Sequence, residues 1–197
     1  MELPAEKYDP VIEAMSDDGY RLKRVDELLR HPKLQDFEPK DVVEVLTVLT
    51  GAGFMSPAQQ PSGKAIEQCR ALNRHILDRA LVSMDMHHMA SPVTAGGIAV
   101  PHMTQLFIRA LSEGKRSPDA VANYVWDFLD SIGERLLKDG NRIESKNENL
   151  KQIGISVSKF LKFDRPLLEA LQIIEPCVNA ASLMRGQKVM ASGAGSP

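Results

Sequence analysis

Residues 117–137, SPDAVANYVWDFLDSIGERLL, decide the fold class of this chain. Apolar side chains recur in this stretch every three or four residues, which is the spacing of one buried face of a helix. Ser117 and Pro118 stand where an N-cap and a first helical turn favour serine and proline. The stretch therefore predicts an amphipathic helix packed on a helical core. Its apolar face consists of Val121, Val125, Phe128, Leu129, Ile132 and Leu136.

Helical patterns continue on both sides of this stretch. Residues 150–161 repeat the apolar stripe after a turn at 138–141, and Pro166 opens a further short helical segment. Before it, residues 101–114 start at a proline and end near a glycine, and residues 62–80 start at a serine that can cap a helix. The C-terminal lobe is therefore expected to be helical.

One segment breaks the helical pattern. Residues 89–100, MASPVTAGGIAV, combine β-branched side chains with a Gly-Gly pair, which predicts two short extended segments around a turn. Little sheet is expected beyond it. Glycine lets another backbone approach closely, so Thr94, Gly96 and Gly97 are the predicted interaction residues of the chain.

The N-terminal part has the outline of a winged helix. Helical spacing over residues 22–29 stops at His31-Pro32, and a second helix is expected over residues 39–51 with a glycine at its end. Phe54 and Met55 then suggest a small wing-like extension.

The predicted fold is mainly α with a small β element, in which a winged-helix-like N-terminal part is followed by a helical C-terminal lobe. Residues 1–20 are assigned to an N-terminal extension and residues 21–89 to the winged-helix-like part. Residues 90–175 form the helical lobe with its short β turn, and residues 176–197 form a flexible tail.

Composition and charge limit the class of protein. With 43% hydrophobic and 25% charged residues, the chain has the composition of a soluble globular protein. No apolar run approaches the roughly 20 residues that span a bilayer, and no secretory signal is visible, so a cytoplasmic protein without a membrane partner is expected. A formal net charge of −2, with an acidic excess in residues 1–57, argues against nucleic-acid binding.

The sequence offers no convincing catalytic, cofactor or metal site. Gly51-Ala52-Gly53 follows a helical segment and not a strand, so it is interpreted as a helix end and not as a nucleotide loop. The Met and His residues of segment 84–89 lack the spacing of a metal site. Cys69 and Cys177 are interpreted as buried free thiols, with a disulfide left open. No catalytic, cofactor-binding or metal-binding residue is therefore assigned.

Five motifs follow one another along the chain: LLRHPKLQDFEP (28–39), VLTVLTGAGFMSPA (45–58), ALNRHILDRA (71–80), MASPVTAGGIAVPHMTQLFIRAL (89–111) and VWDFLDSIGERLLKDG (125–140). Their order, from about residue 20 to residue 175, resembles the methyltransferase regulatory domain region, including the winged-helix-like part, of bacterial SAM-dependent protein lysine methyltransferases. The segment running from SPVTAGGIAV into QLFIRAL is the most specific part of this resemblance.

The resemblance implies an accessory or regulatory module that is not catalytic alone. In such enzymes a SAM-binding domain precedes this region, and this chain has no glycine-rich SAM loop, so SAM would be bound by a separate domain or partner. The expected partner is a methyltransferase catalytic domain or subunit, and the chain is either a stand-alone protein or a piece of a longer enzyme. Homo-oligomers are left open. The alternatives are a winged-helix DNA-binding regulator and a small-molecule sensor with a pocket around residues 84–89.

Overall fold

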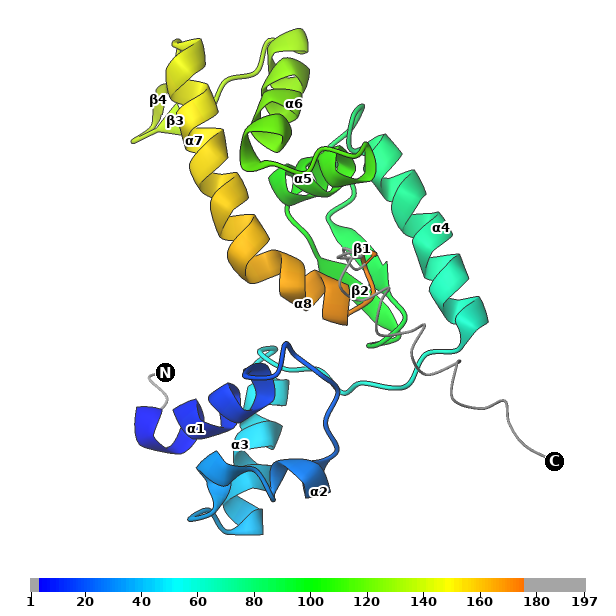
Figure 1. Ribbon diagram of the computed structural model, residues 1–197, viewed down its shortest axis with the longest axis vertical. Coiled ribbons are helices and arrows are strands. Elements are labelled where there is room, and N and C mark those ends of the chain that lie inside the picture. Colours follow the sequence, from blue (N-terminus) through cyan, green and yellow to red (C-terminus); the bar gives the residue numbers. More distant parts are fainter. Residues whose placement is uncertain (1–3, 176–197) are drawn as a thin grey trace, which may run out of the picture.

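The computed structural model describes residues 4–175, which fold mainly as helices with two short two-stranded sheets (Figure 1). A mainly helical fold with a small β element is therefore confirmed. The elements are α1 (Ala5–Ser16), α2 (Val25–Leu28), the 3₁₀ turn η1 (Pro32–Leu34), α3 (Pro39–Gly51), α4 (Gly63–Arg79), β1 (His88–Ser91), β2 (Gly96–Ala99), α5 (His102–Ser112), α6 (Pro118–Ser131), β3 (Leu137–Lys138), β4 (Asn141–Arg142), α7 (Lys146–Lys159), the π-helical turn η2 (Phe160–Asp164) and α8 (Arg165–Ala170).

The apolar side chains form two separate cores. The smaller core lies among α1, α2, η1 and α3, and the larger one lies among the elements from α4 to α8 (Figure 1). Residues 52–62 connect them. Helix α4 packs on the larger core through Ile76 and Leu77, whereas the sequence analysis groups it with the N-terminal part. The reason is that the buried residues of α4 lie in its C-terminal half, and the helix contacts β1 and α5.

The N-terminal core contains a helix that the sequence analysis missed. Residues 1–20 are interpreted there as an extension, but α1 buries Tyr8, Val11 and Ala14 against α3 and η1. The apolar spacing of i, i+3 and i+6 was masked by Pro10, which lies inside the helix and normally disfavours one. Burial of this face offsets the cost of the proline.

The helix pair of the winged-helix outline is present only in part. The first helix shortens to the single turn α2, while α3 runs to Gly51 as expected. The N–H groups of Phe54 and Met55 both donate to the carbonyl of Leu49, at 2.9 and 3.3 Å, so these residues close the helix end. Gly53 has φ +79°, as a glycine that ends a helix does. Between residues 4 and 87 the structure has no strand, so no β wing follows α3.

The larger core follows the predicted stripes closely. Val121, Val125 and Leu129 of α6 are buried, and residues of α7 pack across them. The helix is shorter than expected, because Gly133 adopts φ +73° and the Glu134 N–H donates to the Leu129 carbonyl. The stripe therefore ends before Ile132, whose side chain is exposed.

Helix α6 begins at a serine N-cap, Ser117. Ser117 Oγ accepts a hydrogen bond from the Ala120 N–H at 3.2 Å, as the sequence predicts. Replacing Ser117 with alanine removes this bond, so we expect the free energy of unfolding to fall by about 1 kcal/mol in a urea titration. Ser131→Ala at the exposed end of the same helix is the control. Equal losses in both variants would contradict a specific capping role.

Candidate functional site

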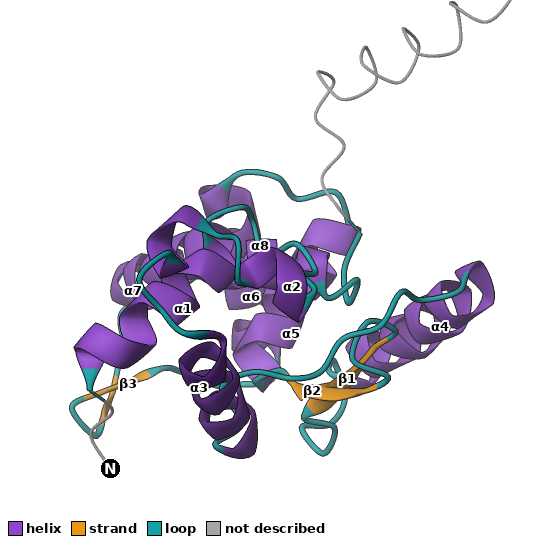
Figure 2. Cartoon of the chain, turned by 90° about the horizontal axis from the view of Figure 1, so that it is seen from below, coloured by secondary structure: helices purple, strands orange, loops and turns teal. Residues whose placement is uncertain are grey.

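Strands β1 and β2 form the antiparallel hairpin that the sequence predicts over residues 89–100. Their register pairs His88 with Ala99 and Ser91 with Gly96, and residues 92–95 make the turn. Ala95 turns the chain with φ +54°. In the turn Pro92 and Val93 are buried, Thr94 is half-buried and Ala95 is exposed. Figure 2 shows the hairpin beside α4, at the edge of the molecule.

The side of the hairpin formed by β1 is fixed to the larger core by two polar side chains. Asn73 of α4 is buried and holds both backbone groups of Ala90, donating to the carbonyl at 2.9 Å and accepting from the N–H at 2.7 Å. Ser91 Oγ donates to the Leu171 carbonyl at 2.8 Å, just after α8. These bonds tie β1 to two segments that are distant in sequence, so the hairpin is rigidly positioned.

The opposite side of the hairpin, the outer edge of β2, is an open strand edge. In an antiparallel ladder the backbone groups of a residue point alternately toward and away from the partner strand. The backbone groups of Ala90 point away from β2, toward Asn73, so those of its partner Gly97 point away from β1. The backbone groups of Ala99, two residues further along β2, point in the same direction as those of Gly97. Both residues are exposed, and within residues 4–175 their N–H groups have no hydrogen-bond acceptor. Such an edge can pair with a strand of another protein.

The three predicted interaction residues lie together in this hairpin but differ in what they expose. Gly96 and Gly97 are exposed, whereas the hydroxyl of Thr94 is buried and has no partner among the described residues. A Cβ added to Gly97 would lie 3.3 Å from Cβ of His88, while one added to Gly96 would meet nothing closer than 3.8 Å. Gly97 is therefore the position of the two at which a side chain would crowd the opposite strand.

A contact that the sequence does not reveal joins the connecting segment to the turn. The Gln59 N–H donates to the Val93 carbonyl at 2.9 Å, and its side-chain amide donates to the Pro92 carbonyl at 3.3 Å. Residues 52–62 lead from the smaller core, so the hairpin receives contacts from both halves of the chain. The residue pattern does not indicate this pairing, because the residues that it joins are more than 30 positions apart in the sequence and the acceptors are backbone carbonyls.

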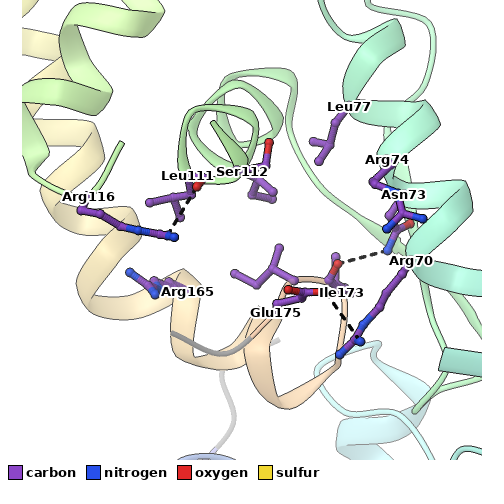
Figure 3. A pocket seen from close by; sticks show the side chains of 12 residues that line it. Arg70, Asn73, Arg74, Leu77, Leu111, Ser112, Arg116, Arg165, Ile173 and Glu175 are labelled. Atoms are coloured by element: carbon purple, nitrogen blue, oxygen red, sulfur yellow. Dashed lines mark hydrogen bonds and ion pairs between the residues drawn. The ribbon is translucent and has the colours of Figure 1, made fainter. Parts of the chain in front are cut away.

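A cavity of about 500 Å³ opens between α4, α5 and α8 (Figure 3). It was not predicted from the sequence, because its lining residues come from three segments that lie far apart along the chain. The cavity is lined by Arg70, Asn73, Arg74, Leu77, Ile108, Leu111, Ser112, Arg116, Arg165, Ile173, Ile174 and Glu175.

The structure also locates the methionine segment 84–89 and Cys69, which the sequence analysis considered as possible sites. Met84 is exposed while Met89 is fully buried, so the methionines of segment 84–89 do not line one site. The described part of the chain contains no cluster of three or more His, Cys, Asp or Glu side chains that could hold a metal ion. Cys69 is a half-buried free thiol, and Cys177 lies outside the described residues. Among residues 4–175, every helix is too short or too polar to cross a bilayer.

Comparison with known proteins finds a distant relative. An uncharacterized protein of the cyanobacterium Synechocystis sp. is 29% identical to the chain over 175 residues. The match covers 88% of this chain and 33% of that protein, so the chain spans about a third of the length of this relative. No family model matches the chain. No solved structure matches it either.

Proposed function

We propose that the chain is a non-catalytic accessory module that acts in the cytoplasm on the catalytic domain or subunit of a SAM-dependent methyltransferase. The outer edge of β2 is its docking surface, and Gly96 and Gly97 allow the partner backbone to approach. The observation that carries the proposal is the open strand edge, which lies within the segment that most resembles methyltransferase regulatory domains.

Three further features support this function. The hairpin is held by Asn73 and Ser91, so its free edge is presented in a fixed geometry, which lowers the entropy cost of docking. Its turn contacts the connecting segment through Gln59, so docking can bias the position of the smaller core. A relative about three times as long is also consistent with a module that operates inside or beside a larger protein.

The DNA-binding alternative gains no support from the helix that would read the major groove. Lys40 of α3 pairs with Glu38 at 2.7 Å, and Lys7 pairs with Glu44 at 2.9 Å. The basic groups next to this helix are thus neutralised by neighbouring carboxylates, which leaves little to attract phosphates. The winged-helix reading of this part stays a prediction.

The proposed function is tested by cofactor titration and by capture of the partner. Calorimetric titration with SAM and S-adenosylhomocysteine should give no binding heat, because the proposal leaves the cofactor to the partner. The immobilised chain should retain a SAM-dependent methyltransferase from native lysate, identified by mass spectrometry. Stoichiometric binding of SAM by the chain alone would overturn the proposal.

Ala99→Pro tests the docking surface directly. Proline removes the N–H that points away from β1, and edge strands tolerate proline there because the hairpin loses no hydrogen bond. The missing donor and the ring beside the edge should weaken binding of the captured methyltransferase about ten-fold or more, as measured by calorimetry with the purified partner.

Ala99→Val is the matched control for this prediction. Valine keeps the N–H and favours the strand conformation, so it should bind the partner like the original chain. Circular dichroism and thermal melts of both variants check that the fold is intact. Equal affinities for the proline and valine variants would show that the partner does not pair with this edge.

A further inference from the structure

The cavity between α4, α5 and α8 carries more positive than negative charge. Its lining includes Arg70, Arg74, Arg116 and Arg165 but a single carboxylate, Glu175. Arg70 pairs with Glu175 at 3.6 Å, and Arg165 pairs with Glu169 at 2.7 Å. Two of the four guanidinium groups are thus paired with a carboxylate.

The remaining two arginines have no carboxylate partner within residues 4–175. Arg74 forms no ion pair there, and Arg116 donates only to the Leu111 carbonyl at 3.4 Å. Like charges gathered around one cavity repel each other, so an anion in the cavity would relieve this repulsion. The charge balance therefore favours an anionic ligand.

Arg70 provides a second, independent sign of a missing acceptor. Its Nε atom is buried, and no acceptor lies within hydrogen-bonding distance among the described residues. Buried polar groups are normally hydrogen-bonded, and a charged donor left without a partner is costly. The guanidinium of Arg70 therefore lacks one of its hydrogen bonds, although its Nη1 pairs with Glu175.

The arrangement of the arginines suggests the shape of the ligand. Arg116 and Arg165 lie on one side of the cavity, and Arg70 and Arg74 lie on the opposite side (Figure 3). Apolar side chains complete the lining between them. These side chains are Leu77, Ile108, Leu111, Ile173 and Ile174.

The side chains of residues 176–197 cannot supply the missing charge. This part of the sequence contains Arg185 and Lys188 but no aspartate or glutamate. A carboxylate side chain from this segment is therefore excluded as the counter-charge, and the cavity volume of about 500 Å³ lies within the range of small-molecule sites.

We propose that this cavity binds a small organic dianion, with a carboxylate or phosphate group at each end and a non-polar middle. Each anionic end is held by one pair of arginines, because a guanidinium group donates two parallel hydrogen bonds to such groups. The apolar lining packs against the middle of the ligand. This site is separate from the edge of β2 and does not depend on the proposed function.

Calorimetry with matched probes tests the proposal. Adipate carries a carboxylate at each end, and the bis(methyl phosphate) diester of hexanediol carries one negative charge on the phosphate at each end, so these two dianions represent the carboxylate and phosphate sources of the same chemistry. Hexanoate has the same length and one charge. At least one dianion should bind at a ratio of one per chain, about ten-fold or more tighter than hexanoate.

Arginine variants link this binding to the cavity. Arg74→Gln and Arg116→Gln each remove one unpaired guanidinium at the exposed rim, on opposite sides, and each should weaken dianion binding about ten-fold. Arg79→Gln is the control, because Arg79 also lies on α4 but points to Asp85 and does not line the cavity. Thermal melts should be the same for all three variants.

Each outcome decides the proposal. Binding of adipate alone assigns the site to dicarboxylates, and binding of the bis(methyl phosphate) diester alone assigns it to phosphate esters. The proposal is overturned when neither dianion gives binding heat at millimolar concentration, or when hexanoate binds as tightly as the dianions. It is also overturned when Arg79→Gln weakens binding as much as the two cavity variants.

Discussion

Replacement of Phe160 by alanine is expected to lower the free energy of unfolding by about 3–5 kcal/mol, which is typical of a buried phenylalanine. The side chain is 1% exposed and belongs to the larger core. Its ring lies 5.5 Å from the ring of Phe107, at an interplanar angle of 47°, which is a favourable tilted arrangement. The variant loses this contact and leaves a cavity between α5 and the end of α7.

The backbone around Phe160 explains why the surroundings cannot easily collapse into that cavity. Phe160 begins the π-helical turn η2, and its carbonyl accepts a hydrogen bond from the Arg165 N–H, five residues on. Pro166 follows directly and lacks an N–H for a normal helical bond. The wider π turn accommodates this proline, so the position of the backbone is fixed from both sides.

Phe163 in the same π turn provides the matched control. Its side chain is 58% exposed, so Phe163→Ala should change the free energy of unfolding by about 0.5 kcal/mol or less. Urea unfolding followed through the fluorescence of Trp126, the single tryptophan, measures both variants. Equal losses for the two phenylalanines would contradict the packing argument.

The helices of the larger core could be predicted because their signals are local. The stripes of α6 and α7 have a period that a short window of sequence reveals, and Ser62 and Ser117 mark helix starts through their own side chains. Helix α1 has no such local signal. Pro10 lies inside it, and its buried face consists only of Tyr8, Val11 and Ala14.

The candidate sites show the same division. The hairpin over residues 88–99 could be predicted from its β-branched residues and glycines, since a turn is a local property. The cavity could not, because Arg70 and Arg74 meet Arg116 and Arg165 only after α4, α5 and α8 have packed together. Each of these arginines reads as an ordinary surface residue in its own segment. They form a candidate site because all four line the same cavity.

Replacement of Asn73 by leucine is expected to destabilise the protein strongly, because Asn73 supports both sites at once. The buried amide binds the N–H and carbonyl of Ala90 and also donates to the Ile173 carbonyl at 3.2 Å, in the wall of the cavity. Leucine has a similar size but leaves these three backbone groups without a partner. We expect the free energy of unfolding to fall by about 3 kcal/mol in a urea titration.

Asn149→Leu separates the local role of Asn73 from its contribution to stability. Asn149 is equally buried and binds three backbone groups, at Leu136, Ile143 and Ser145, so its loss should lower stability by a similar amount. Hydrogen exchange then distinguishes the variants under conditions where both are folded. Asn73→Leu should speed exchange of the β1–β2 amides, whereas Asn149→Leu should leave them protected. Unchanged exchange in the Asn73 variant would mean that the hairpin holds its position without the amide, and the rigid docking edge would then need another support.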